Sequence, residues 1–172
     1  MAATAACWGK GTAGTSTLQR PRKLGPIGIQ LYTVRAQMRA DMPGTIAKIA
    51  GLGYKEVEFA GYFNRTAKQV REMLDANGLT SPSTHIGFDA MKRDWDKTFD
   101  DALAIGQQFL VVPSPPSGTT STVASWQRLA GDFNAAGERA RARGLTLGYH
   151  NHYTEFNAIE TTSAFEILCT RT

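Results

Sequence analysis

The chain has 172 residues, of which 42% are hydrophobic and 20% charged, the composition of an ordinary globular domain. Its 19 basic and 15 acidic residues give a formal net charge of +4, and this small excess, spread along the chain, does not indicate a nucleic-acid-binding protein. No run approaches the roughly 18 apolar residues of a membrane helix, and Cys7 and Cys169 form no CxxC pair and no cluster with histidine that would indicate a zinc site or disulfide framework.

The first 25 residues are rich in Ala, Gly, Thr and Ser and show neither helical nor strand periodicity. We interpret them as a disordered lead-in, followed by one domain over residues 26–172. A secretory signal would place positive charge before an apolar stretch, whereas here Arg20, Arg22 and Lys23 come last. Cytoplasm is therefore the default expectation for the compartment, with the periplasm as the alternative.

From residue 27 onward, short apolar runs alternate with longer segments of helical period, a pattern typical of βα units in a parallel sheet. Five strands are predicted, at residues 27–32, 55–59, 79–85, 109–113 and 145–150. Their starts recur at intervals of roughly 30 residues, the length of one βα unit. The third strand is the weakest prediction, because Pro82 lacks the backbone N–H that a central strand needs.

Between these strands, apolar residues recur with the i, i+3, i+4 spacing of one helix face. The four sets are Ile46, Ile49 and Ala50; Val70, Met73 and Leu74; Trp95, Phe99, Ala102 and Leu103; and Leu129, Phe133, Ala136 and Ala140. Thr66 and Gln69 have the spacing of a capping box, which predicts the start of the second helix. A glycine precedes each later strand, as expected where a helix ends in a left-handed residue: Gly53, Gly78, Gly106 and Gly144.

Polar residues stand where the predicted strands end, and in a parallel barrel these ends open on one face. They are Gln30 and Tyr32, Glu58, His85, Ser114, and His150 and His152. Each also has a structural interpretation. Gln30 could only satisfy backbone groups, Glu58 could share a solvent face with Glu56, and His85 could cap a loop. An imidazole at His85 is equally suited to bind or protonate a sugar hydroxyl or carbonyl.

The segment at residues 149–156 carries the most chemical information. Residues i and i+2 of a strand point the same way, so His150 and His152 present two imidazoles to one side if the extended chain continues. Two imidazoles with Glu155 nearby are a plausible start for a divalent metal site. The alternative is that one histidine is buried and hydrogen-bonded while Glu155 is a loop charge.

Four motifs together resemble the sugar phosphate isomerase/epimerase family of xylose isomerase-like TIM barrels. They are Ile-Gly-Ile-Gln-Leu-Tyr-Thr-Val-Arg at 27–35, Gly-Tyr-Lys-Glu-Val-Glu-Phe-Ala-Gly at 53–61, Ser-Thr-His-Ile-Gly at 83–87 and Gly-Tyr-His-Asn-His at 148–152. The resemblance implies a (β/α)8 barrel that binds a divalent metal (Mn, Co, Mg or Zn) and isomerises or epimerises a keto-sugar or polyol derivative by proton transfer next to a carbonyl.

With this resemblance, we assign each candidate a role. His85 and Glu155 are the catalytic candidates, Gln30, Tyr32, Glu58 and His152 the substrate-binding candidates, and His150 the metal ligand. The expected partner is a small sugar, with neither nucleic acid nor membrane. In such families the metal ligands are typically a glutamate, an aspartate, a histidine and a second glutamate on strands five to eight. Here histidines occupy the end of the fifth strand, which departs from that pattern.

Length sets a further expectation, since such barrels need at least about 200 residues. We expect an α/β fold that is a partial (β/α)8 TIM barrel, with about five parallel strands, outer helices and the C-terminal strands missing. Residues 165–168 would begin a fifth helix. Such a chain is expected to be poorly active and to self-associate through open sheet edges. The alternatives are a noncatalytic barrel fragment, a weak carbohydrate-binding module, and a DNA repair endonuclease of the same superfamily.

Overall fold

The computed structural model describes residues 24–119 and 121–172. A five-stranded parallel sheet forms its centre, with the strands in chain order. This confirms the predicted α/β fold and all five predicted strands, to within three residues at each end. The strands are β1 Gly28–Gln30, β2 Glu56–Ala60, β3 Thr80–His85, β4 Phe109–Val112 and β5 Thr146–Tyr149.

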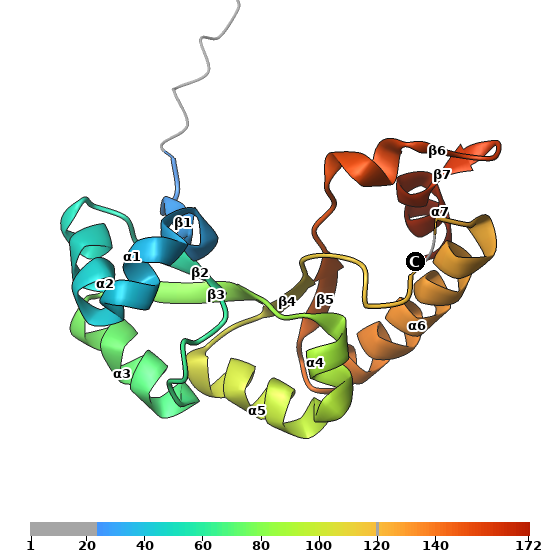
Figure 1. The fold of residues 1–172 in the computed structure, drawn as a ribbon. Helices are drawn as coiled ribbons and strands as arrows, with labels where there is room; N and C mark the ends of the chain where they lie inside the picture. The colour runs from blue at the N-terminus through green and yellow to red at the C-terminus, as the bar shows by residue number, and fades with distance from the viewer. Residues whose placement is uncertain (1–23, 120) are drawn as a thin grey trace, which may run out of the picture.

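Helices connect the strands and cover one face of the sheet, as Figure 1 shows for α3, α5 and α6. None of the helices within the described residues is both long and apolar enough to cross a bilayer. The helices are α1 Arg35–Ala40, α2 Met42–Gly51, α3 Ala67–Ala76, α4 Phe88–Arg93, α5 Trp95–Ile105, α6 Val123–Ala142 and α7 Ala164–Arg171. Two 3-10 turns, η1 Leu31–Val34 and η2 Tyr153–Phe156, follow β1 and β5, and a small antiparallel hairpin, β6 Ala158–Ile159 with β7 Thr162–Ser163, leads into α7.

The hydrophobic core lies between the sheet and the helices. Alternate residues of each strand point to opposite faces, so Val57 and Phe59 of β2 pack against the helices while their neighbours face the other way. Phe59 is fully buried, which contributes roughly 2–3 kcal/mol relative to an exposed ring. The predicted helix faces are buried in most positions. Leu103 is the exception, 43% exposed, because Ile105 takes the fully buried place on α5.

The capping box predicted at the start of α3 and the glycine predicted after its end are both confirmed. The Thr66 hydroxyl accepts from the Gln69 backbone at 3.2 Å, and the Gln69 side chain accepts from the Thr66 backbone at 3.0 Å, so both arms of the capping box are present. After the helix, Gly78 has a φ of +61°, in the left-handed region that a side chain would disfavour. The turn therefore returns the chain to the sheet at Leu79, whose N–H bonds the Leu74 carbonyl.

β3 pairs with both β2 and β4 despite Pro82, which confirms the third predicted strand. Its register with β2 shifts by one residue, since Glu56 pairs with Thr80 but Glu58 pairs with Ser83. This is a β-bulge, one of the places where a sheet tolerates proline. The carbonyl of Pro82 still accepts a hydrogen bond from the Gln108 backbone, at 2.8 Å.

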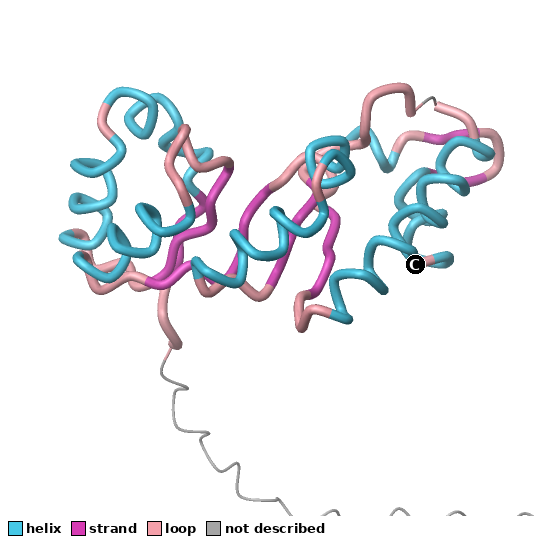
Figure 2. Tube along the Cα trace, turned by 90° about the horizontal axis from the view of Figure 1, so that it is seen from below, coloured by secondary structure: helices cyan, strands magenta, loops and turns pink. Residues whose placement is uncertain are grey.

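The sheet is an open arc, with β1 and β5 as its edges in the described part of the chain. Figure 2 shows the arc from below, with the two edge strands far apart. The fold is thus the partial barrel that the sequence predicts. Its face away from the helices carries Phe109, which is 44% exposed and pairs with Ser83 in the neighbouring strand. The predicted lead-in lies almost wholly outside the described residues, and its disorder stays a prediction.

Candidate functional site

The carboxyl ends of four strands converge on one cavity of about 480 Å³. Its lining includes five residues that the sequence predicted for a site, from β1, β3 and β5 and the turns that follow them: Gln30, Tyr32, His85, His150 and His152. Pro113 and Ser114, just after β4, complete the lining. Since the strands are parallel, their polar ends meet at the same edge of the sheet, as expected for a barrel of this kind.

Glu58, which does not line this cavity, pairs with His85, which does. The Glu58 carboxylate lies 3.1 Å from His85 Nε2, across the β2–β3 ladder. The other carboxylate oxygen accepts a hydrogen bond of 2.5 Å from the Ser83 hydroxyl. Only 10% of the His85 side chain and 26% of that of Glu58 are exposed. The Ser83 hydroxyl thus orients the carboxylate, and the carboxylate in turn orients the imidazole through Nε2.

Gln30 determines which ring nitrogen of His85 carries the hydrogen in the neutral imidazole. The Gln30 amide oxygen accepts from the Tyr32 backbone at 2.8 Å, which turns the amide nitrogen towards His85 Nδ1 at 3.4 Å. An amide nitrogen only donates, so Nδ1 is the acceptor and Nε2 carries the hydrogen that Glu58 accepts. The contact with Gln30 is long for a hydrogen bond, and a ligand hydroxyl could therefore replace the amide at Nδ1.

Burial lowers the pKa of His85 below its ordinary value of 6.5. The Glu58 carboxylate acts in the opposite direction, because it stabilises the imidazolium, while His150 and His152 lower the pKa further. The net effect favours the neutral imidazole. His85 is therefore available as a base near neutral pH, with Glu58 placed to stabilise the charge that forms when it takes a proton.

His150 and His152 bring two further imidazoles to the same place. The ring of His150 lies 5.0 Å from that of His85 and 4.9 Å from that of His152, between centroids. β5 ends at Tyr149, but the His150 backbone still donates to the Val112 carbonyl at 2.9 Å, so the strand direction continues to the first histidine. Within the described residues, no other side chain hydrogen-bonds to the ring nitrogens of either histidine.

Glu155 is not part of this cluster. It is 2% exposed, and its carboxylate accepts hydrogen bonds from the Tyr149 hydroxyl at 2.6 Å, the Thr154 hydroxyl at 2.8 Å and the His152 backbone at 3.0 Å. Burial alone would raise the pKa of Glu155, but these three hydrogen bonds, together with one from its own backbone, outweigh burial and lower the pKa. The carboxylate thus anchors the turn after β5, an environment that the sequence did not reveal. Its assignment as a catalytic group remains a prediction that the structure does not support by contact.

A divalent cation does not fit the described residues by themselves. They contain no group of three or more His, Cys, Asp or Glu side chains arranged to hold a metal ion. Glu58 engages His85 Nε2, Gln30 makes a long contact with Nδ1, and the Glu155 carboxylate already accepts three hydrogen bonds, so His150 and His152 are the described candidates whose ring nitrogens could bind a metal. A zinc site uses at least three protein ligands, and magnesium and calcium prefer oxygen ligands to imidazoles. The assignment of His150 as a ligand therefore remains a prediction.

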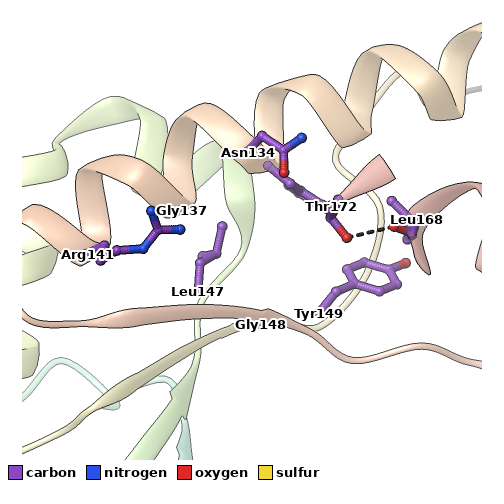
Figure 3. Close-up of a pocket in the computed structure, with 9 residues that line it drawn as sticks. Asn134, Gly137, Arg141, Leu147, Gly148, Tyr149, Leu168 and Thr172 are labelled. Atoms are coloured by element: carbon purple, nitrogen blue, oxygen red, sulfur yellow. Dashed lines mark hydrogen bonds between the residues drawn. The ribbon is translucent and has the colours of Figure 1, made fainter. Parts of the chain in front are cut away.

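A second cavity, of about 240 Å³, lies on the outer side of β5 and is separate from the histidines. Figure 3 shows it between α6, which carries Asn134 and Arg141, and Leu147 to Tyr149 of β5, with the end of α7 closing one side. Of the described residues that line it, Arg141 has the charged side chain. Among the described residues, none that the sequence analysis assigned a role contributes to this lining, although Gly148 and Tyr149 belong to the motif at 148–152.

Two residues near the site, Ser83 and Gln107, were not predicted from the sequence. Ser83, which orients Glu58, lies two residues before His85 and so shares its strand face, a signal that the sequence already contained. Gln107 is 2% exposed, and its side chain bonds Tyr62 and Ser81 beneath the sheet. Nothing in its sequence context distinguishes it from the exposed Gln108 beside it.

The chain belongs to the xylose isomerase-like TIM barrel family, whose pattern matches residues 46–169. Among solved structures it is similar to two sugar phosphate isomerase/epimerase proteins from Parabacteroides distasonis. One is 24% identical with a TM-score of 0.72, over 92% of this chain and 65% of the other. The second is 23% identical with a TM-score of 0.75, over 86% and 65%. No curated protein matches the chain significantly.

A D-psicose 3-epimerase, solved in the presence of D-fructose, is 17% identical with a TM-score of 0.50 and matches 70% of this chain and 50% of its own. At these identities the structural likeness establishes the fold. The chain spans just under two thirds of the length of the first two structures. The resemblance proposed from the four motifs is therefore confirmed at the level of the family and its barrel fold.

Proposed function

We propose that the cavity at the strand ends binds a small keto-sugar or polyol derivative and that His85 moves a proton next to its carbonyl, as in an isomerase or epimerase. One observation carries the proposal: His85 lies between Glu58 at Nε2 and a long, replaceable contact with Gln30 at Nδ1, and it lines a cavity about 480 Å³ in volume. Membership of the xylose isomerase-like family and the epimerases among its structural neighbours support the reaction class.

The chemistry follows from the positions of the side chains. Nδ1 of His85 removes the proton from the carbon beside the carbonyl, and the imidazolium that forms is stabilised by Glu58. Negative charge then develops on the carbonyl oxygen. An N–H of His150 or His152 can donate to that oxygen, which lowers the energy of the enediolate. Return of the proton by the His85 imidazolium to the adjacent carbon, with the hydroxyl proton passing to the former carbonyl oxygen, gives isomerisation. Epimerisation needs a second acid on the opposite face of the enediolate, a role for which His150 and His152 are the candidates.

Metal assistance remains part of the family expectation, but no step above depends on it. A divalent cation would polarise the carbonyl and stabilise the enediolate more strongly than an imidazole. His150 and His152 are the described residues that would contribute to holding it. Because two ligands do not make a tight site, the proposed proton transfer is assigned to His85 alone.

Exchange of the substrate proton into D2O, followed by ¹H NMR, tests the proposal directly. Incubation of an unphosphorylated ketohexose with the protein should remove the signal of the proton beside the carbonyl, even if turnover to product is slow. His85→Gln should reduce exchange by about 100-fold or more, the usual contribution of a general base. Glu58→Gln should have a smaller effect, about tenfold, since the base stays but loses its orienting partner.

Glu56→Gln is the matched control, because Glu56 lies two residues from Glu58 on the same strand and pairs with Gly28 rather than contacting His85. It should leave the exchange rate unchanged. Exchange that persists in His85→Gln would remove His85 from the proposed role.

A noncatalytic sugar-binding protein is the second candidate, favoured by the open arc of the sheet and by the lack of a three-ligand metal cluster among the described residues. It predicts saturable perturbation of the His150 and His152 imidazole signals by a ketohexose with no proton exchange. Exchange above the buffer background would rule it out.

A further inference from the structure

The β-bulge in β3 decides which side of the sheet its polar residues face. In a regular strand, Ser81, Ser83 and His85 would share one face, because side chains alternate. The structure instead buries Ser81 and Thr84, at 1% and 0% exposure, three positions apart on the helix side. The extra residue opposite β2 accounts for the shift, since Glu58 pairs with Ser83 rather than with Pro82.

The consequence reaches the candidate site. Beyond the bulge, Ser83 and His85 turn to the side of Glu58, where the hydroxyl and the imidazole bind its two carboxylate oxygens. Without the extra residue both side chains would point into the helix layer. The Glu58–His85 pair therefore exists only because β3 is irregular at this point.

A buried chain of hydrogen bonds holds the bulge in shape. The Ser81 hydroxyl donates to the Ser83 carbonyl at 3.1 Å, which satisfies a backbone acceptor within the bulge. The Gln107 amide donates to the Ser81 oxygen at 3.2 Å, and the Tyr62 hydroxyl donates to the Gln107 oxygen at 2.8 Å. Gln107 comes from the loop between α5 and β4, and Tyr62 from the loop after β2, so three segments are joined beneath the sheet.

Pro82 complements this arrangement. A bulge ordinarily leaves one backbone N–H without its ladder partner, and a buried orphan donor costs about 1–3 kcal/mol. Proline has no N–H, so that cost does not arise here. The residue that weakened the strand prediction is therefore suited to the irregular position.

We propose that Ser81 and Gln107 are positioning residues: by holding the bulge they place His85 on the cavity side of the sheet against Glu58. Neither side chain lines the cavity that holds the histidines. Their importance for catalysis rests on the proposed function, whereas their effect on the orientation of His85 does not.

The test reads the His85 imidazole itself. The chain contains three histidines, so ¹⁵N-labelled imidazole spectra are simple to assign through His85→Gln, at a pH near 8 where neutral imidazoles dominate. The unaltered protein should show His85 as a single Nε2–H tautomer. Ser81→Ala and Gln107→Leu should convert it to a mixture of both tautomers and slow substrate proton exchange by about tenfold or more, as small displacements of a base do.

Two controls separate positioning from general loss of stability. Gln108→Leu changes the adjacent, exposed glutamine and should leave the tautomer unaltered. Thr66→Ala weakens α3 at its cap, away from the bulge, and should lower stability without affecting His85. If Gln107→Leu fails to fold, Ser81→Ala decides the matter, because it removes a single oxygen.

A pure Nε2–H signal in a folded Ser81→Ala variant would overturn the inference. If the tautomer changes in Ser81→Ala while proton exchange is absent from the unaltered protein, the positioning inference stands and the proposed reaction is wrong.

Discussion

The Glu58 carboxylate and the His85 imidazole lie 3.1 Å apart on neighbouring strands, and each is held by a second partner, Ser83 for the carboxylate and Gln30 for the imidazole. Together with Gln30, the pair joins β1, β2 and β3. The residues that these strands contribute are more than twenty positions apart in the sequence. Its geometry leads to the first of four predictions.

Stability should fall as the pH is lowered past the ordinary pKa of histidine. Burial lowers the pKa of His85 below 6.5, so the unfolded chain binds a proton that the folded chain resists. This contribution is fully present above pH 6.5 and is lost as the pH falls through the lower folded value. Thermal melts between about pH 7.5 and about pH 5.5 should show a declining midpoint that is flatter in His85→Gln. Glu155, with a pKa below 4.5, titrates outside this window. An identical slope in the variant would contradict the assignment.

Glu155→Gln should destabilise the fold by about 2 kcal/mol, because the amide replaces one acceptor of a buried, charged hydrogen-bond network with a donor. Urea denaturation measures the loss, and Glu138→Gln, on the exposed face of α6, is the control with no expected change. The exchange assay should still detect activity in the folded fraction of Glu155→Gln. Loss of exchange at full folding would instead support the predicted catalytic role of Glu155.

Removal of the α3 cap should cost about 1 kcal/mol, since Thr66→Ala leaves the Gln69 backbone N–H without its acceptor. Thr66→Ser keeps the hydroxyl and should retain most of the stability. Chemical denaturation of both variants provides the comparison, and equal losses would show that the methyl group, rather than the cap, matters.

Self-association should depend on the open face of the sheet. Phe109 is 44% exposed there, between two strands, whereas Leu103 is 43% exposed on the outer surface of α5. Sedimentation velocity should show oligomers of the unaltered chain that Phe109→Lys reduces and Leu103→Lys leaves in place, because charge on an open sheet opposes association. A monomer at all concentrations would exclude this interface.

The fold was largely predictable because its signals are local. Apolar runs, glycine positions and the Thr66 cap depend on neighbours in sequence, and they identified five strands and the ends of α3. The bulge at Pro82 was read as a weakness because its compensation lies in Gln107 and Tyr62, distant residues that only the tertiary structure brings close.

The candidate site was also predictable only in part from the sequence. Strand-end position sufficed to select Gln30, His85, His150 and His152, which do converge on one cavity. It does not extend to Glu155, whose catalytic role stays a prediction, since proximity in sequence to two histidines says nothing about the direction of a side chain in a turn. The donors that capture its carboxylate, Tyr149 and Thr154, decide that direction.

Gln30 ties the first turn of the chain to the imidazole of His85: its oxygen caps the 3-10 turn at Tyr32 while its nitrogen reaches the ring. β1 is an edge strand of only three residues, paired on one side within the described residues. Fraying of this short strand would withdraw the amide and leave the ring free to rotate. The order of the His85 imidazole is thus coupled to this short edge strand, so hydrogen exchange at the Tyr32 backbone N–H should report on both.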